Sequence, residues 1–361
     1  SLIFVDEAHS ALPLRLLPLA WHWMNVLSDE WSCYWVLASG SLVRYWELQP
    51  LSGLSMPRPE IAELVRPDLQ RELSRYESNR ITFRWREKPI GRKELAEWVQ
   101  EALGPRLLIL NTVQSAAVIA ADIAAEFGQT HVEHLSTALT PEDRGNTIDR
   151  IRRRLADPDD ADWTLVATSC VEAGVDFSFR TGFREISSLL SLLQAAGRVN
   201  RHGRNTEAVM WSFSLQDDSM LPKNPALDVS AAVLRSYFQK RLPITPELST
   251  RSMQDELVRD DSCMSAICDF AELEAAQQFR TLAQKFRVID QKTVLAVPDD
   301  SMASAIAEGR ASWQELQRHA VSVRKEKIVL WHLREIADGI YQWTLGYDSF
   351  LGYMHGVLLT E

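Results

Sequence analysis

Two short segments hold the residue types that nucleotide chemistry needs. Asp6 and Glu7 adjoin in Asp-Glu-Ala-His, and Arg198 and Arg201 stand three residues apart in Gln-Ala-Ala-Gly-Arg-Val-Asn-Arg. An Asp can hold Mg²⁺, and a neighbouring Glu can polarise an attacking water. A guanidinium can neutralise charge that develops on a transferred phosphoryl group. Residues three apart share a helix face, so we predict two arginine fingers, with structural ion pairs as the alternative.

The acidic pair follows the apolar run Leu2-Ile3-Phe4-Val5, which is typical of a buried parallel strand. Ligands of open α/β sheets lie at the carboxyl ends of strands. We therefore predict Asp6 as the Mg²⁺ ligand and Glu7 as the base. A solvated strand end is the alternative. A second apolar run, Trp35 to Ala38, leads directly into Ser39-Gly40-Ser41, which taken alone is an ordinary turn of small residues.

Two further strand ends carry polar residues. The run Trp163 to Ala167 leads into Thr168 and Ser169, whose hydroxyl and backbone groups suit the phosphates of a nucleic-acid strand. Asn111 and Thr112 follow the run 106–110 and open an Ala-rich helix that extends to Phe127. We predict them as a helix cap first and a phosphate contact second. For the segment after Thr168, an ordinary βα loop is the alternative.

Alternating strand and helix patterns must position these residues, which predicts an α/β fold. Helices are expected at 93–103, 111–127 and from Pro141, and later at 226–240, 265–286 and 312–320, with a strand at 294–297. The arginines at 71, 75, 80, 84 and 86 favour a solvated helix and an edge strand over a phosphate surface. The aromatic residues Trp331, Tyr341, Trp343 and Tyr347 favour core packing over base stacking.

Composition limits the class of protein. The length of 361 residues allows two or three domains, and the hydrophobic content of 46% supplies an ample core. The four cysteines show neither C-x-x-C spacing nor a plausible disulfide framework, so reduced thiols and a cytoplasmic location are expected. No run approaches the roughly 18 apolar residues of a membrane span, so no membrane partner is expected. A net charge of -10 argues against a generally basic nucleic-acid coat, although a locally basic cleft stays compatible with it.

The sequence lacks the phosphate-binding pattern G-x-x-x-x-G-K-[ST]. Its lysine and backbone donors have no evident substitute elsewhere in the chain. We therefore expect that the chain alone does not hydrolyse ATP. We also expect that it is the C-terminal part of a longer polypeptide.

The motif order resembles the helicase portion of the CRISPR-associated helicase-nuclease of type I systems, a superfamily 2 helicase. The matching segments are D-E-A-H, S-G-S, N-T-V-Q-S-A, T-S-C-V-E-A-G-V-D-F and Q-A-A-G-R-V-N-R-H-G-R, with 283–297 and Tyr347-Asp348 beyond them. The resemblance implies RecA-like lobes and a mixed C-terminal accessory domain. It assigns 1–52 to a partial first lobe, 53–90 to a linker and the start of the second lobe, 91–215 to a complete second lobe, and 216–361 to the accessory domain.

The resemblance also implies the activity. Such a protein is an ATP-driven translocase that moves 3′ to 5′ on single-stranded DNA, uses ATP and Mg²⁺, and unwinds target DNA for degradation in CRISPR interference. An RNA-guided surveillance complex recruits it, and an HD nuclease acts with it. Because no His-Asp doublet occurs, the nuclease is expected to be fused upstream or separate. The residues implied for ATP binding and coupling are His9, Ser39, Ser41, Gly174, Asp176 and Gln194.

Some positions depart from the family pattern. Ala195 replaces an Arg, Ser169 replaces a Gln, and Gly40 replaces an Ala. Two other functions fit the same residues: an RNA helicase of the D-E-A-H group, and a non-catalytic truncated interaction fragment. The segment from Asn200 to Gly203 favours the CRISPR-associated family over an RNA helicase. The missing P-loop, in contrast, favours the non-catalytic fragment.

Overall fold

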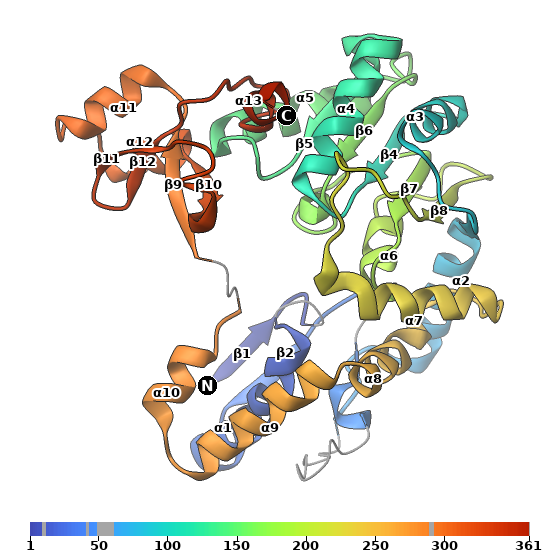
Figure 1. The fold of residues 1–361 in the computed structure, drawn as a ribbon. Coiled ribbons are helices and arrows are strands. Elements are labelled where there is room, and N and C mark those ends of the chain that lie inside the picture. The colour runs from blue at the N-terminus through green and yellow to red at the C-terminus, as the bar shows by residue number, and fades with distance from the viewer. Residues whose placement is uncertain (9–11, 41–42, 49–60, 289–291, 361) are drawn as a thin grey trace. The chain divides into compact units, whose positions relative to one another are not determined.

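The computed structural model describes residues 1–361 apart from 9–11, 41–42, 49–60, 289–291 and 361 (Figure 1). The fold is α/β, as the sequence predicts, and the chain forms two compact units. The first unit contains 1–78, 187–194 and 226–290, and the second contains 79–186, 195–225 and 291–361. Each unit thus combines segments that are distant in sequence. The boundaries expected at 52, 90 and 215 stay a prediction.

The first unit contains a pair of short parallel strands, β1 (Leu2–Val5) and β2 (Tyr34–Leu37). Leu2 lies opposite Tyr34 and Val5 opposite Leu37 in the register. Both strands lie within one residue of the expected positions, but the prediction that the first is buried is wrong, because Leu2 and Phe4 are 60% and 71% exposed. Their carboxyl ends therefore meet at one edge, which is where the Asp6 and Ser39 segments begin.

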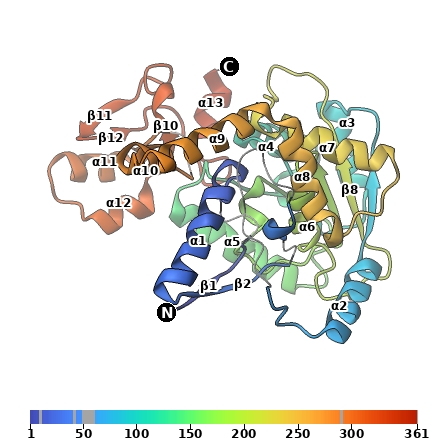
Figure 2. The same ribbon diagram turned by 90° about the horizontal axis from the view of Figure 1, so that it is seen from below.

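Helices complete the first unit. They are α1 (Leu17–Trp31), most of α2 (Pro67–Arg80), α7 (Asp228–Gln239), α8 (Ser249–Arg259), α9 (Asp261–Ala275) and α10 (Phe279–Lys285), with short 3-10 turns η1 (Leu14–Leu16), η2 (Tyr45–Glu47) and η6 (Pro246–Leu248). Figure 2 shows α1 beside β1 and β2, and α1 also packs on α9. The predicted single helix 265–286 is wrong, because the chain turns between α9 and α10, where Gln277 has a φ of 56°.

A six-stranded parallel sheet forms the centre of the second unit, in the order β3-β8-β7-β4-β6-β5. The strands are β3 (Thr82–Trp85), β4 (Arg106–Ile109), β5 (Val132–Leu135), β6 (Thr164–Ala167), β7 (Thr181–Glu185) and β8 (Val209–Phe213). The edge strand predicted in the Arg-rich stretch is confirmed as β3. Every residue of β4, β5 and β6 is buried, as expected of a parallel sheet covered on both faces.

In the second unit, α4 (Val113–Phe127) and α5 (Pro141–Ala156) pack on the sheet, and α3 (Arg92–Glu101) packs on α4. Helix α6 (Leu189–Ala196) follows β7 in sequence, and most of it belongs to the first unit. The 3-10 turns η3 (Gln129–His131) and η4 (Ser169–Val171) belong to the second unit, and η5 (Pro225–Leu227) lies at the chain's return to the first. The hydroxyl of Thr140 caps α5 by accepting from the Asp143 N–H at 3.2 Å. Among the helices that the structure describes, none is both long and apolar enough to cross a membrane.

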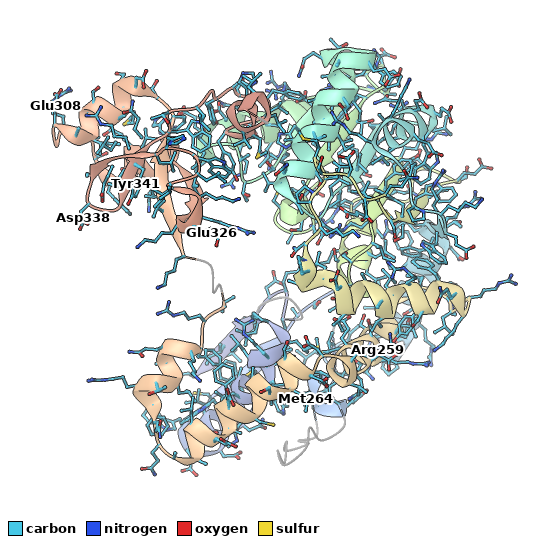
Figure 3. All side chains as sticks on the ribbon, viewed as in Figure 1. Arg259, Met264, Glu308, Glu326, Asp338 and Tyr341 are labelled. Carbon is cyan, nitrogen blue, oxygen red and sulfur yellow. The ribbon has the colours of Figure 1, made fainter. Side chains whose placement is uncertain are left out.

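The C-terminal segment forms a mixed four-stranded sheet in the order β10-β9-β12-β11. Its elements are β9 (Thr293–Val297), α11 (Asp300–Ala307), α12 (Trp313–His319), β10 (Val321–Arg324), η7 (Lys325–Lys327), β11 (Arg334–Ala337), β12 (Ile340–Gln342) and α13 (Met354–Thr360). Trp343 is 2% exposed and joins the core that contains α4, which confirms that the C-terminal aromatics pack in the core. Figure 3 shows Glu308, Glu326 and Asp338 at the exposed edges of this segment.

Candidate functional site

The acidic segment lies at the carboxyl end of β1, as predicted. Asp6 is exposed, and its Oδ1 accepts a hydrogen bond from the Glu7 N–H at 2.9 Å. Glu7 has a φ of 48°, a left-handed conformation that turns the chain sharply out of the strand. Ala8 is only 4% exposed and fixes the far side of the turn. His9 lies outside the described residues.

Backbone hydrogen bonds join the acidic segment to the segment of Ser39. Ala38 N–H donates to Val5 O at 2.9 Å, and Ala8 N–H donates back to Ala38 O at 3.2 Å. Ser39 follows directly and is half-buried. Because the connection runs through the main chain, a shift of one segment displaces the other whatever the side chains are. Ser41 lies outside the described residues.

A suitable Mg²⁺ site needs hard oxygen donors, and the Asp6 carboxylate supplies them. Mg²⁺ usually takes one or two carboxylates and completes its shell with nucleotide phosphates and water. Among the described residues, no group of three or more His, Cys, Asp or Glu side chains could hold a metal by itself. The donor that the acidic segment offers to such an ion is the exposed Asp6 carboxylate.

In the second unit, Thr168 ends β6 and precedes the turn η4. Its N–H donates to Leu135 O at 3.3 Å, and its hydroxyl donates to Cys170 Sγ at 3.5 Å. The Cys170 thiol in turn donates to Leu135 O at 3.5 Å, and burial raises the pKa of this thiol. Thr168 is 8% exposed, whereas Ser169 is exposed. Of the two predicted phosphate contacts, Ser169 is the one with solvent access.

Thr112 caps a helix as predicted, whereas Asn111 makes contacts that were not predicted. The Thr112 hydroxyl caps α4 by accepting from the Ser115 N–H at 3.0 Å, so the predicted cap is confirmed. Asn111 instead accepts from Arg184 Nη1 at 2.6 Å, and its amide nitrogen donates to Ile186 O at 3.0 Å. Its side chain therefore joins β4 to the end of β7.

A buried ion pair lies next to Asn111. Arg184 Nε is 2.9 Å from Glu172 Oε1, and these two side chains are 3% and 7% exposed. Glu185 Oε2 accepts the Asn111 N–H at 2.7 Å. Burial raises the pKa of Glu185, and the Asn111 N–H and the charge of Arg184 act in the opposite direction. Asn111 and the turn after η4 are thus connected through Arg184.

Arg198 fastens the other side of the η4 turn. It is 8% exposed, and its guanidinium donates from Nε to Val171 O at 3.0 Å and from Nη2 to Glu172 O at 2.8 Å. Charge-assisted hydrogen bonds of this kind are about twice as strong as neutral ones. The turn that carries Ser169 is therefore held in place by Arg198.

Arg201 has different surroundings. The Arg201 side chain is 40% exposed, and its Nε lies 2.8 Å from Asp176 Oδ1. The main-chain N–H of Arg201 donates to Ser178 Oγ at 3.1 Å. Asp176, which the resemblance assigns to ATP binding and coupling, thus lies beside a predicted finger. Gly174 has a φ of +76°, with open space where a Cβ would lie, so backbone conformation is the reason for glycine there.

The expectation that Arg198 and Arg201 share a helix face is wrong. Helix α6 ends at Ala196, and Asn200 has a φ of 46°, which no helix accommodates. The Asn200 amide is 1% exposed and donates to Arg80 O and Asn205 O at 2.9 and 2.8 Å. Asn tolerates this conformation better than most residues. Gln194 lies on α6 before that end, in the segment 187–194 of the first unit.

Arg80 also departs from expectation. Most of α2 is exposed, as predicted, but Arg80 is 8% exposed and donates to Ala196 O at 3.2 Å and to Val199 O. These carbonyls lie in the loop that carries Arg198 and Arg201. Its task is therefore to hold that loop.

Comparison with known proteins gives one consistent match. Residues 103–204 match the family described as CRISPR-associated nuclease/helicase Cas3, C-terminal. The Cas3 nuclease/helicase of Methanothermobacter thermautotrophicus is 21% identical over 271 residues, which cover 68% of this chain and 31% of that protein. That of Haloferax volcanii is 43% identical over 60 residues, 16% of this chain and 6% of that protein. These matches show that the chain is similar to the C-terminal helicase region of Cas3.

Solved Cas3 structures share the fold. T. fusca Cas3 has a TM-score of 0.57 at 15% identity, over 95% of this chain and 51% of that chain. A chain of the "CRISPR RNA-guided surveillance complex, pre-nicking" has a TM-score of 0.56 at 16% identity, over 97% of this chain and 56% of that chain. The chain thus spans about half the length of the solved Cas3 structures that it matches. The resemblance inferred from motif order is confirmed.

Sequence reasoning missed Glu172, Arg184 and Glu185 as contributors to the Cas3-type site. Glu172 stands inside a quoted motif, but charged residues are rarely fully buried unless paired, and its partner lies on another strand. One signal was present, because Arg184 and Glu185 are charged residues directly before the apolar run of α6. A charge at the carboxyl end of an otherwise buried strand indicates a polar network.

Proposed function

We propose that this chain is the helicase part of an ATP-dependent translocase on single-stranded DNA, which unwinds target DNA for degradation in CRISPR interference. The observation that carries the proposal is the connection of three predicted motifs in the second unit. Arg198 holds the turn after Thr168, and Arg184 ties that turn to Asn111. A parallel α/β sheet binds ligands at this edge, so the connected residues lie where function is expected.

Asp6 and Glu7 are proposed to act on ATP, Asp6 as the Mg²⁺ ligand and Glu7 as the base. When bound, Mg²⁺ would neutralise phosphate charge. The first unit is proposed as the partial first RecA-like lobe. The P-loop is proposed to lie outside these 361 residues, which contain no G-x-x-x-x-G-K-[ST] pattern. This location agrees with the 51% of T. fusca Cas3 that the chain matches.

Arg201 is proposed as the arginine finger, and Arg198 as a residue that positions it and the Ser169 turn. Arg201 is half exposed and bound to an exposed acid, so it can exchange Asp176 for a phosphate at little cost. Arg198 donates two hydrogen bonds to carbonyls at a buried position. It is therefore better suited to holding the turn than to exchanging these partners for a phosphate.

The nucleic-acid contacts are proposed at the η4 turn and the start of α4. Ser169 is exposed, and Asn111, Thr112 and Thr168 are the other proposed contacts. Contacts of this kind with phosphates position a strand without reading its sequence. Ser169 stands where the family pattern has a glutamine, so it offers a hydroxyl donor in place of a side-chain amide.

The partners are proposed from the relatives. One matched structure is a CRISPR RNA-guided surveillance complex, so such a complex is proposed to recruit the whole protein. An HD nuclease, fused or separate, is proposed to degrade the unwound strand. The boundaries at 52, 90 and 215, with 91–215 as the complete second RecA-like lobe and 216–361 as the accessory domain, belong to the same proposal.

The test is ATP hydrolysis by the whole protein, measured without nucleic acid and with single-stranded DNA or RNA. Selective stimulation by DNA supports the proposal. Selective stimulation by RNA indicates an RNA helicase of the D-E-A-H group instead. No hydrolysis with either polymer indicates a non-catalytic interaction protein.

A further inference from the structure

A basic pocket lies in the first unit, away from the acidic segment. Its volume is about 320 Å³, and it is lined by η1, α9 and the end of α10. The residues that determine its chemistry are Arg15, Asp269, Phe270, Lys285 and Arg287. Pockets from about 300 Å³ upward accommodate small ligands, so this one has room for roughly one nucleotide unit.

The charges in the pocket favour an anion. Among the described residues that line the pocket, three are cations, Arg15, Lys285 and Arg287, and one is a carboxylate, Asp269. The ion pair between Lys285 and Asp269 is loose, because Lys285 Nζ and Asp269 Oδ2 are 3.9 Å apart. The pocket is thus locally positive in a chain whose net charge is -10. Local cations of this kind, and not net charge, determine where phosphates bind.

The cations are held in place by contacts between segments that are distant in sequence. Arg15 Nη2 donates to Arg287 O at 2.8 Å, which ties η1 to the chain after α10. Below them, Leu16, Leu19 and Phe270 form a buried cluster, and the rings of Phe270 and Phe286 are 6.1 Å apart. The labelled Met264 in Figure 3 marks the part of α9 just before the pocket wall. The basic groups therefore stand on a packed floor.

We propose that this pocket binds phosphate groups of a single-stranded nucleic acid, as a second contact outside the predicted motifs. The inference rests on the proposed function for its ligand. Guanidinium groups match phosphate oxygens in geometry. Phe270 is 5% exposed and offers no face for base stacking, so the pocket holds the backbone and does not select a sequence.

The test is the salt dependence of binding between the whole protein and a labelled single-stranded oligonucleotide, followed by fluorescence anisotropy. Lys285→Gln with Arg287→Gln removes two phosphate partners, and each lost contact lowers the slope of log affinity against log salt by about 0.7. We expect the slope to fall by about 1.4. The matched control is Arg280→Gln, which removes an exposed charge from the same helix outside the pocket lining.

A variant that is expected to bind more tightly controls for loss of binding through misfolding. Asp269→Asn removes the acid of the pocket and is expected to tighten binding about two- to fivefold. An unchanged slope in the double variant, or an equal loss in Arg280→Gln, overturns the site. Displacement of the oligonucleotide from wild-type protein, but not from the double variant, by millimolar mononucleotide would identify a nucleotide pocket instead and also overturn it.

The outcome for wild-type protein separates the two proposals. If wild-type protein binds neither DNA nor RNA, the proposed function fails and the pocket fails with it. If wild-type protein binds DNA and the pocket variants bind as tightly with the same slope, only the pocket fails.

Discussion

At the residue scale, Arg198 and Arg201 are two arginines that differ in burial and in hydrogen-bond partners. Arg198 is buried and donates to two main-chain carbonyls, whereas Arg201 is half exposed and pairs with exposed Asp176. Loss of a buried partner leaves carbonyls without a donor, which costs more than loss of a surface ion pair. A residue that supports a turn and a residue that can move to a ligand should therefore differ in their effect on stability.

We expect Arg198→Ala to lower the free energy of unfolding by about 2 to 4 kcal/mol, because two charge-assisted hydrogen bonds are lost in a buried site. Arg201→Ala should lower it by less than about 1 kcal/mol. Urea unfolding of both variants beside the wild type measures the difference. Equal losses of unfolding free energy would show that Arg198 does not stabilise the fold more than Arg201 does.

The ion pair of Glu172 and Arg184 gives a second prediction. Glu172→Gln or Arg184→Met alone leaves a buried charge without its partner, which should cost about 3 to 5 kcal/mol. The double variant should cost less than the sum of the two by about 1 to 3 kcal/mol, because neither charge is then left alone. A double-mutant cycle by urea unfolding measures this coupling. Strict additivity would mean that the pair does not act as a unit.

At the scale of elements, β5 and the C-terminal segment meet at a buried histidine. His134 is 1% exposed, and its Nδ1 lies 2.7 Å from Phe350 O. Burial lowers the pKa of His134 to about 4, against about 6.5 for an unperturbed histidine. Between these values the unfolded chain binds a proton that the folded chain does not, so stability falls as the pH is lowered.

We expect this histidine to lower the free energy of unfolding by up to about 3 kcal/mol between pH 6.5 and pH 4. In His134→Gln that pH-dependent part should disappear, and the glutamine amide can still donate to Phe350 O. Urea unfolding at several pH values is the measurement, with His131→Gln as the control in the preceding turn. The prediction fails if His134→Gln keeps the full pH dependence of the wild type.

Local patterns predicted many of these elements but not their partners. The cap of α4, strands β1, β4 and β6, and the edge position of β3 follow from residues near each other in sequence. Strands β5 and β7 were missed because His134 and Arg184 interrupt an apolar pattern. Those side chains are satisfied by Phe350, Asn111 and Glu172, which are distant in sequence. The helical placement of Arg198 failed for a similar reason, since Asn200 ends the regular backbone through contacts with Arg80 and Asn205.

At the scale of the whole molecule, the predicted site is divided between two compact units. Asp6, Glu7 and Ser39 belong to the first, and Arg198, Arg201 and the η4 turn belong to the second. In the proposed motor, the acidic pair of the first unit acts on ATP, and Arg201 of the second unit is the finger. The basic pocket at Arg15 adds a proposed DNA contact to the first unit.

The most direct test of this account is DNA-stimulated ATP hydrolysis by the whole protein with Arg201→Ala. We expect the turnover rate to fall by about 10³ or more, as for other arginine fingers, while stability changes little. Arg204→Ala, an exposed arginine three residues further on, should keep the wild-type rate within about twofold and is the matched control. An Arg201→Ala protein that hydrolyses ATP at the wild-type rate would contradict the account.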